Sequence, residues 1–166
     1  MAPQDPVLLL HGMGCGPWVW SEVTSHLAGV AVMPVHLAGH RGGVPLDPRS
    51  GLSAAEQMVE DLERRLDRAG VDRAHVVGNS LGGGTAVRLA LDHPGRAGRL
   101  VLMAPGGLGV NVFAPDPTEG IKKLYAFGAP PGPSKEKLAE FLRTLVFDQK
   151  MITDELVDER YQYAAD

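Results

Sequence analysis

Four short apolar runs, none of which alternates polar with apolar residues, limit what this 166-residue chain can fold into. The runs are Val7–Leu10, Val30–Met33, His75–Val77 and Leu100–Met103. Continuous stretches of valine and leucine are typical of strands buried on both faces, as in a parallel sheet. The first run is too short for a membrane span or the core of a signal peptide. The sequence therefore predicts a mostly parallel sheet.

Helical patterns lie between these runs. Ser53 and Glu56 have the spacing of a capping box, and behind them apolar residues recur at every fourth position until Gly70. Leu81–Leu91 predicts the next helix, which Pro94-Gly95 ends. Alternation of strands and helices implies right-handed crossovers and a layered α/β fold with flanking helices.

The pattern changes after Pro105, where a loop is expected over residues 106–117. No buried strand is predicted after Met103. The candidate helices in this part are residues 119–127, 135–146 and 154–163. We therefore expect residues 1–104 to form the N-terminal part of an α/β core and residues 105–166 to form a helical segment.

Composition excludes several function classes. The chain is 44% hydrophobic and 22% charged, which is ordinary for a globular protein. Its net charge of −4 offers no basic footprint for nucleic acid. The single cysteine, Cys15, cannot form an internal disulfide, so a cytoplasmic location is expected. A small molecule is the expected partner, and the sequence leaves the oligomeric state open.

Gly78-Asn79-Ser80-Leu81-Gly82 matches the G-x-S-x-G pattern and has the required context, with an apolar run before it and a helical pattern after it. The sharp turn makes Ser80 a candidate nucleophile and demands small residues at Gly78 and Gly82. The backbone N–H of Leu81, at the start of the helix, would face a developing oxyanion. The alternative is a glycine-rich helix start without chemistry.

The glycine-rich stretch after the first run can supply a second oxyanion donor, the backbone N–H of Met13. We interpret His11 as structural, and no motif supports Cys15 as a nucleophile. Trp20 is expected to pack against the following helix or to line the pocket. Residues 39–43 lack the Lys-Ser/Thr of a phosphate loop and are interpreted as a tight turn.

A serine nucleophile needs a general base, and only one histidine, His93, follows Ser80. The helix between them places His93 roughly 20 Å away at about 1.5 Å per residue. Proton transfer requires about 3 Å. His40 is the only plausible local substitute.

These features resemble the α/β-hydrolase superfamily. From about residue 72 to residue 166 the chain is similar, more specifically, to the meta-cleavage product hydrolases. The stretches that carry this likeness are Gly78–Gly83, Leu102–Gly109, Phe113–Pro115, Glu119–Lys122, Phe147–Gln149, Ile152-Thr153 and Glu159–Tyr161. The resemblance implies hydrolysis of carbon–carbon bonds in 2-hydroxy-6-oxo-hexa-2,4-dienoates, the products of ring-cleaving dioxygenases. It implies no metal and no organic cofactor, and it makes the helical segment the start of a cap.

The resemblance also implies roles for single residues. Ser80 would be the nucleophile, and Asn79 would help to hold the dienoate head. Arg160 would meet the substrate carboxylate and enolic oxygen, a bidentate task that suits guanidinium. Without the resemblance, Arg160 would be a solvated charge. A pocket between the strand ends and the cap would have apolar walls, for which the candidates are Trp20, Met103, Phe113 and Phe141, with core packing as the alternative for each.

The first half departs from the family pattern. The family has Gly-Gly-Gly-Pro-Gly-Ala where this chain has Met13–Pro17, and Trp-Ser-Asn where it has Trp20-Ser21-Glu22. A carboxylate at Glu22 would repel an anionic dienoate if it faced the pocket. Residues 35–43 look more like esterase-type α/β-hydrolases. A carboxylesterase for small esters is therefore the alternative function.

The family order of catalytic residues is serine, then an acid, then histidine. Three acids that follow Ser80 are Asp116, Asp148 and Asp154, but they lie in cap-like sequence with no histidine after them. We therefore expect the C-terminal half of the core to be absent, with an apolar sheet edge left uncovered. A truncated, non-catalytic fragment is the third interpretation.

Overall fold

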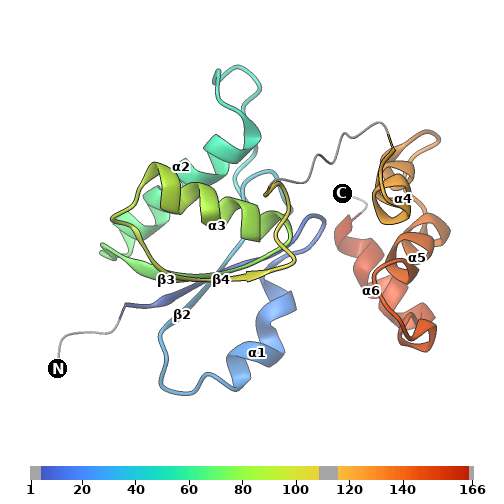
Figure 1. Cartoon of the computed structure of the whole chain (residues 1–166), viewed down its shortest axis with the longest axis horizontal. Helices are drawn as coiled ribbons and strands as arrows, with labels where there is room; N and C mark the ends of the chain where they lie inside the picture. The colour runs from blue at the N-terminus through green and yellow to red at the C-terminus, as the bar shows by residue number, and fades with distance from the viewer. Residues whose placement is uncertain (1–4, 109–115, 165–166) are drawn as a thin grey trace. The chain divides into compact units, whose positions relative to one another are not determined.

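The structure is a computed structural model that describes residues 5–108 and 116–164 (Figure 1). The chain divides into two compact units, Met1–Leu108 and Gly109–Asp166, and we describe each by itself. In the described parts of the chain, no helix combines the length and the apolar character that crossing a bilayer requires.

The first unit contains one parallel sheet of four strands, in the order β2-β1-β3-β4. The strands are β1 (Val7–Leu10), β2 (Val32–Val35), β3 (Ala74–Asn79) and β4 (Ala97–Met103). The predicted parallel sheet is therefore confirmed. In the two central strands, Leu8 pairs with Val76, and both side chains are fully buried.

Three of the four strands have bounds that differ from the predicted runs, and β3 covers Ala74–Asn79 instead of residues 75–77. β2 was expected over residues 30–33 but continues through Pro34 to Val35. Proline removes a donor from the ladder, and a strand at the sheet edge tolerates that loss. β4 was expected to begin at Leu100 but begins at Ala97. The pairing with β3 continues past a register shift, at which two residues of β4, Gly98 and Arg99, lie opposite the single residue His75.

Helices cover both faces of this sheet (Figure 1). On one face lie α2 (Ala54–Arg68) and α3 (Leu81–Asp92), and on the other lie η1 (Pro17–Trp20) and α1 (Ser21–Ser25). The predicted capping box at the start of α2 is present, since Glu56 N–H donates to Ser53 Oγ and Ser53 N–H donates to Glu56. The core between sheet and helices consists mainly of Leu8, Leu10, Val35, Leu37, Val59, Leu62, Leu66, Val76 and Leu89.

The second unit is helical, as the sequence predicts. Its elements are α4 (Glu119–Gly128), α5 (Lys135–Arg143), η2 (Gln149–Met151) and α6 (Asp154–Ala164). Leu138 and Val157 are at the centre of its small core. The prediction that α5 continues to residue 146 is wrong. Thr144 Oγ1 donates to the carbonyl of Phe141, a local bond that competes with the helical pattern and ends the helix.

β4 lies at the edge of the sheet, next to β3 only. Three consecutive apolar side chains at its carboxyl end are exposed: Val101 by 53%, Leu102 by 37% and Met103 by 47%. An apolar edge strand of this kind is open to pairing with a further strand.

Candidate functional site

Ser80 lies where β3 ends and α3 begins, with φ 51° and ψ −116°. A non-glycine residue with positive φ is strained unless its surroundings hold it. Here they do, because Ser80 N–H donates to the carbonyl of Met103 at 2.9 Å and the Ser80 carbonyl accepts from Gly106 N–H at 2.8 Å. The turn therefore presents the Ser80 side chain at the carboxyl end of the sheet.

The turn closes only because its neighbours have no side chains. A Cβ atom on Gly78 would lie 2.3 Å from the carbonyl oxygen of Gly82. A Cβ atom on Gly82 would lie 2.4 Å from the carbonyl oxygen of Leu10. The spacing of the two glycines around Ser80 is therefore a steric requirement of this turn.

Two backbone N–H groups beside Ser80 have no acceptor among the described residues. Leu81 is the first residue of α3, so its N–H has no acceptor within the helix. Met13 lies in a turn in which Cys15 N–H donates to the carbonyl of Gly12. A Cβ atom on Gly12 would lie 3.4 Å from Ser80 Cβ, so this turn is adjacent to the serine. The arrangement suits a two-donor oxyanion hole, and the roles of Met13 and Leu81 stay predictions.

Asn79 and Met103 also belong to this cluster. The Asn79 side-chain amide donates to the carbonyl of Met103 at 3.3 Å, and Asn79 Oδ1 faces the backbone of Gly12. Trp20 is buried beside β1 and β2, and its Nε1 has no hydrogen-bond partner among the described residues.

Other predicted residues are not placed beside Ser80. Arg160 is half-buried in α6, and Phe141 packs around the core of the second unit. Arg160 belongs to the second unit, whereas Ser80 belongs to the first. Phe113 lies outside the described residues. Glu22 is exposed on α1.

Sequence reasoning missed Ala104, which directly follows β4 and has φ 43°. Positive φ at alanine is strained, and here it turns the chain so that Gly106 N–H reaches the Ser80 carbonyl. Ala104-Pro105-Gly106-Gly107 after an apolar run was the available signal, since glycine and proline mark turns.

No histidine in the described residues is hydrogen-bonded to Ser80. His93 lies at the far end of α3, and its Nδ1 is 3.0 Å from a carboxylate oxygen of Glu63. His40 Nδ1 is 3.2 Å from the carbonyl oxygen of Ala38, and its ring packs edge-on against His11. Neither bonds to the serine. In addition, no group of three or more potential metal ligands occurs within residues 5–108 and 116–164.

His11 is fully buried and has both ring nitrogens engaged. Its Nδ1–H donates to the carbonyl of Gly12 at 2.8 Å, and its Nε2 accepts from Leu37 N–H at 3.1 Å. This pattern requires the neutral ring. Burial lowers the pKa of His11 to about 4. The interactions agree with the structural role expected for His11, because they fix the turn that carries Met13.

The neutral state of His11 predicts a pH dependence of stability. An unfolded histidine binds a proton as the pH falls through about 6.5, whereas folded His11 binds it only near pH 4. The free energy of unfolding should therefore decrease from pH 6.5 towards pH 4, by at most roughly 3 kcal/mol. Urea unfolding at several pH values measures this. His11→Asn should flatten the profile, whereas the exposed control His26→Asn should not. Equal slopes for the two variants would contradict the assignment.

Comparisons with known proteins agree with this geometry. A sequence profile described as "Alpha/beta hydrolase family" matches residues 7–166. A 2-hydroxy-6-oxo-6-phenylhexa-2,4-dienoate hydrolase from Burkholderia cepacia is 40% identical over 95% of this chain and 55% of its own length. The chain thus spans about half the length of this relative. The similarity also includes the first half of the chain, beyond the expected residues 72–166.

Solved structures of similar hydrolases have the same fold as this chain. A meta-cleavage product hydrolase from Pseudomonas fluorescens IP01 has a TM-score of 0.80 at 28% identity, over 98% of this chain and 57% of its own. A 2-hydroxy-6-oxo-6-phenylhexa-2,4-dienoate hydrolase from Rhodococcus sp. strain RHA1 has a TM-score of 0.79 at 27% identity, over 99% of this chain and 59% of its own.

Proposed function

Because the chain belongs to the alpha/beta hydrolase family, we propose that it carries the nucleophile, Ser80, of a hydrolase for carbon–carbon bonds in 2-hydroxy-6-oxohexa-2,4-dienoates. The observation that carries the proposal is the left-handed Ser80 between β3 and α3, beside two backbone N–H groups without acceptors. The 40% identity to a dienoate hydrolase supports the substrate class.

The chemistry follows from these groups. Ser80 Oγ adds to the 6-oxo carbon, and the negative charge that develops on the carbonyl oxygen is stabilised by the N–H groups of Met13 and Leu81. For the carbon–carbon bond to break, the 2-hydroxydiene must first shift its enol proton to C5, which gives a 2-oxo-3-ene. Collapse of the serine adduct then breaks the C5–C6 bond, and its electron pair is delocalised onto the 2-oxo group as a dienolate, which takes up a proton. Water then hydrolyses the acyl-serine and releases a carboxylic acid.

Two further residues, Asn79 and Arg160, are proposed to bind the substrate. Asn79, already tied to the Met103 carbonyl, would contact the dienoate head, and Arg160 would bind its carboxylate. We also keep the cytoplasm as the proposed compartment, because a single cysteine suits a reducing environment.

The described residues supply no general base for Ser80. Ser80 Oγ must lose its proton, and none of the described histidines is hydrogen-bonded to it, since His93 bonds to Glu63 and His40 to Ala38. We infer that residues 1–166 alone bind a dienoate and present the nucleophile but turn over slowly.

Covalent labelling tests the nucleophile. A fluorophosphonate probe, which carries its own leaving group, should label Ser80 slowly, and peptide mass spectrometry should locate the adduct there. Ser80→Ala should remove the labelling, and Ser50→Ala, in an exposed turn, should leave it unchanged. Dienoate should slow the labelling and p-nitrophenyl acetate should not. Protection by the ester alone would favour the carboxylesterase, and equal labelling of Ser80→Ala would refute the nucleophile.

A further inference from the structure

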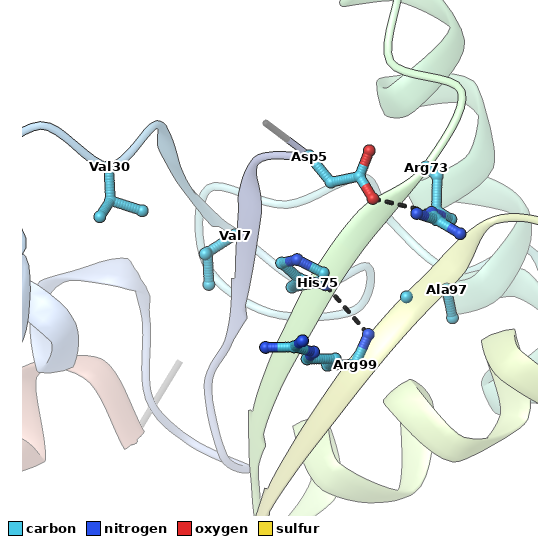
Figure 2. A pocket seen from close by; sticks show the side chains of 8 residues that line it. Asp5, Val7, Val30, Arg73, His75, Ala97 and Arg99 are labelled. Atoms are coloured by element: carbon cyan, nitrogen blue, oxygen red, sulfur yellow. Dashed lines mark hydrogen bonds and ion pairs between the residues drawn. The ribbon is translucent and has the colours of Figure 1, made fainter. Parts of the chain in front are cut away.

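A hollow lies at the amino ends of the strands, at the end of the sheet opposite to Ser80. It measures about 640 Å³ and is lined from the amino ends of β1, β3 and β4 and the segments before them (Figure 2). Ser80 follows the last residue of β3, whereas His75 is near its first, which puts them roughly 16 Å apart at about 3.3 Å per residue. The hollow is therefore separate from the proposed active site.

An irregularity between β3 and β4 shapes this hollow. Ala74 pairs with Ala97 and Val76 pairs with Leu100, so Gly98 and Arg99 together lie opposite His75. Bulges of this kind re-aim side chains and are frequent beside functional sites. Arg99 N–H donates to His75 Nδ1 at 3.0 Å, so the side chain of His75 replaces a backbone acceptor. In the neutral ring the proton is therefore on Nε2, which makes Nε2 a donor.

Gly98 makes room for this histidine. A Cβ atom on Gly98 would lie 2.6 Å from His75 Nδ1 and would displace the ring. The glycine thus lets β4 pass close to the imidazole and leaves the space beside the ring open.

The charges around the hollow are unbalanced. Arg73 Nε donates to an Asp5 carboxylate oxygen at 2.7 Å, and that contact uses one of the five guanidinium donors. The Arg99 guanidinium has no ion pair or hydrogen bond to any described residue. Figure 2 shows both arginines and His75 around the same space. Two guanidinium groups against one carboxylate leave an excess positive charge.

We propose that this hollow binds a small oxyanion, a phosphate or carboxylate group of a small molecule, through Arg99, the open donors of Arg73 and His75 Nε2. Guanidinium donors match the planar and tetrahedral oxygens of these groups. The volume suits a small metabolite. Because Arg73 and Arg99 are exposed, the bound anion stays partly hydrated, and affinity in the millimolar range is expected.

Backbone amide NMR titration of the 17.7 kDa chain tests the proposal. Inorganic phosphate and succinate are the probes, with sodium chloride at matched ionic strength as the reference. Saturable shifts should centre on the amides of His75, Gly98 and Arg99. Arg99→Gln should weaken binding about tenfold, as expected for loss of a charge-assisted bond. Asp5→Asn should strengthen it, because it frees Arg73. Arg49→Gln, a control arginine that is 92% exposed, should change nothing.

The NMR results that support the anion site differ from those that overturn it. Saturation by phosphate alone or by succinate alone supports the site and identifies the preferred group. Shifts that sodium chloride reproduces, or equal affinity in Arg99→Gln and Arg49→Gln, overturn the proposal. Opposite effects of the Asp5 and Arg99 variants cannot arise from misfolding, which would weaken binding in both. Ser80→Ala should bind the anions unchanged, so the result does not depend on the proposed hydrolase function.

Discussion

Purified residues 1–166 are expected to consume 2-hydroxy-6-oxo-6-phenylhexa-2,4-dienoate with a kcat/KM about 10⁴-fold or more below that of a complete relative measured in parallel. Loss of a triad member costs serine hydrolases about 10⁴ to 10⁶ in rate and leaves only what binding and the oxyanion hole supply. The N–H groups of Met13 and Leu81, the proposed oxyanion donors, lie beside Ser80, but His93 is bonded to Glu63 and His40 packs on His11.

Loss of the dienoate absorbance measures this rate, and added imidazole probes its cause. Free imidazole should raise turnover in proportion to its concentration, because it would supply a base that no described histidine provides to Ser80. The increase should be absent in Ser80→Ala, which corrects for imidazole acting on the substrate directly. Fast turnover without imidazole, abolished in both Ser80→Ala and His40→Asn, would instead identify His40 as the base.

Gly82→Ala is expected to lower the free energy of unfolding by about 3 kcal/mol or more, or to prevent folding. Helix propensity alone would favour alanine by roughly 0.5–1 kcal/mol at this position. Sterics dominate, because the new Cβ would lie 2.4 Å from the carbonyl oxygen of Leu10, and backbone in a buried strand cannot move away cheaply.

Urea unfolding at pH 7.5 compares this variant with a matched one. Gly95→Ala puts the same methyl group where nothing lies within 4 Å, and its stability should change by no more than about 0.5 kcal/mol. Similar stability of the two variants would show that the turn around Ser80 is looser than described.

The sequence predicted the parallel sheet and α2 well, because buried strands and a capped amphipathic helix are encoded in neighbouring residues. Ser53 and Glu56 specify the start of α2 by themselves. The start of β4 was not predictable in this way. Gly98 and Arg99 enter the strand only because a histidine from another strand replaces the missing acceptor. Pro34 similarly belongs to a strand only because β2 has no neighbour on one side.

In the candidate site, too, the features encoded by neighbouring residues were predictable and those that depend on distant residues were not. The turn at Ser80 follows from five consecutive residues, so its strained backbone and its glycine requirement could be predicted. For Ala104 the sequence indicates only a turn, because which residue of that turn takes a positive φ depends on where β4 ends beside Ser80. The role of Arg160 depends on how two units meet, and no local pattern encodes that, so it stays a prediction.

The carbonyl of Met103 accepts from both Ser80 N–H and the Asn79 side chain, and Met103 is the last residue of β4, an edge strand. Ser80, the proposed nucleophile, is therefore tethered to a strand with a neighbour on one side only. Fraying of β4, which amide hydrogen exchange would register, also widens the range of positions open to Ser80 Oγ. A further strand paired with β4 would restrict the positions of the Ser80 side chain without touching a substrate.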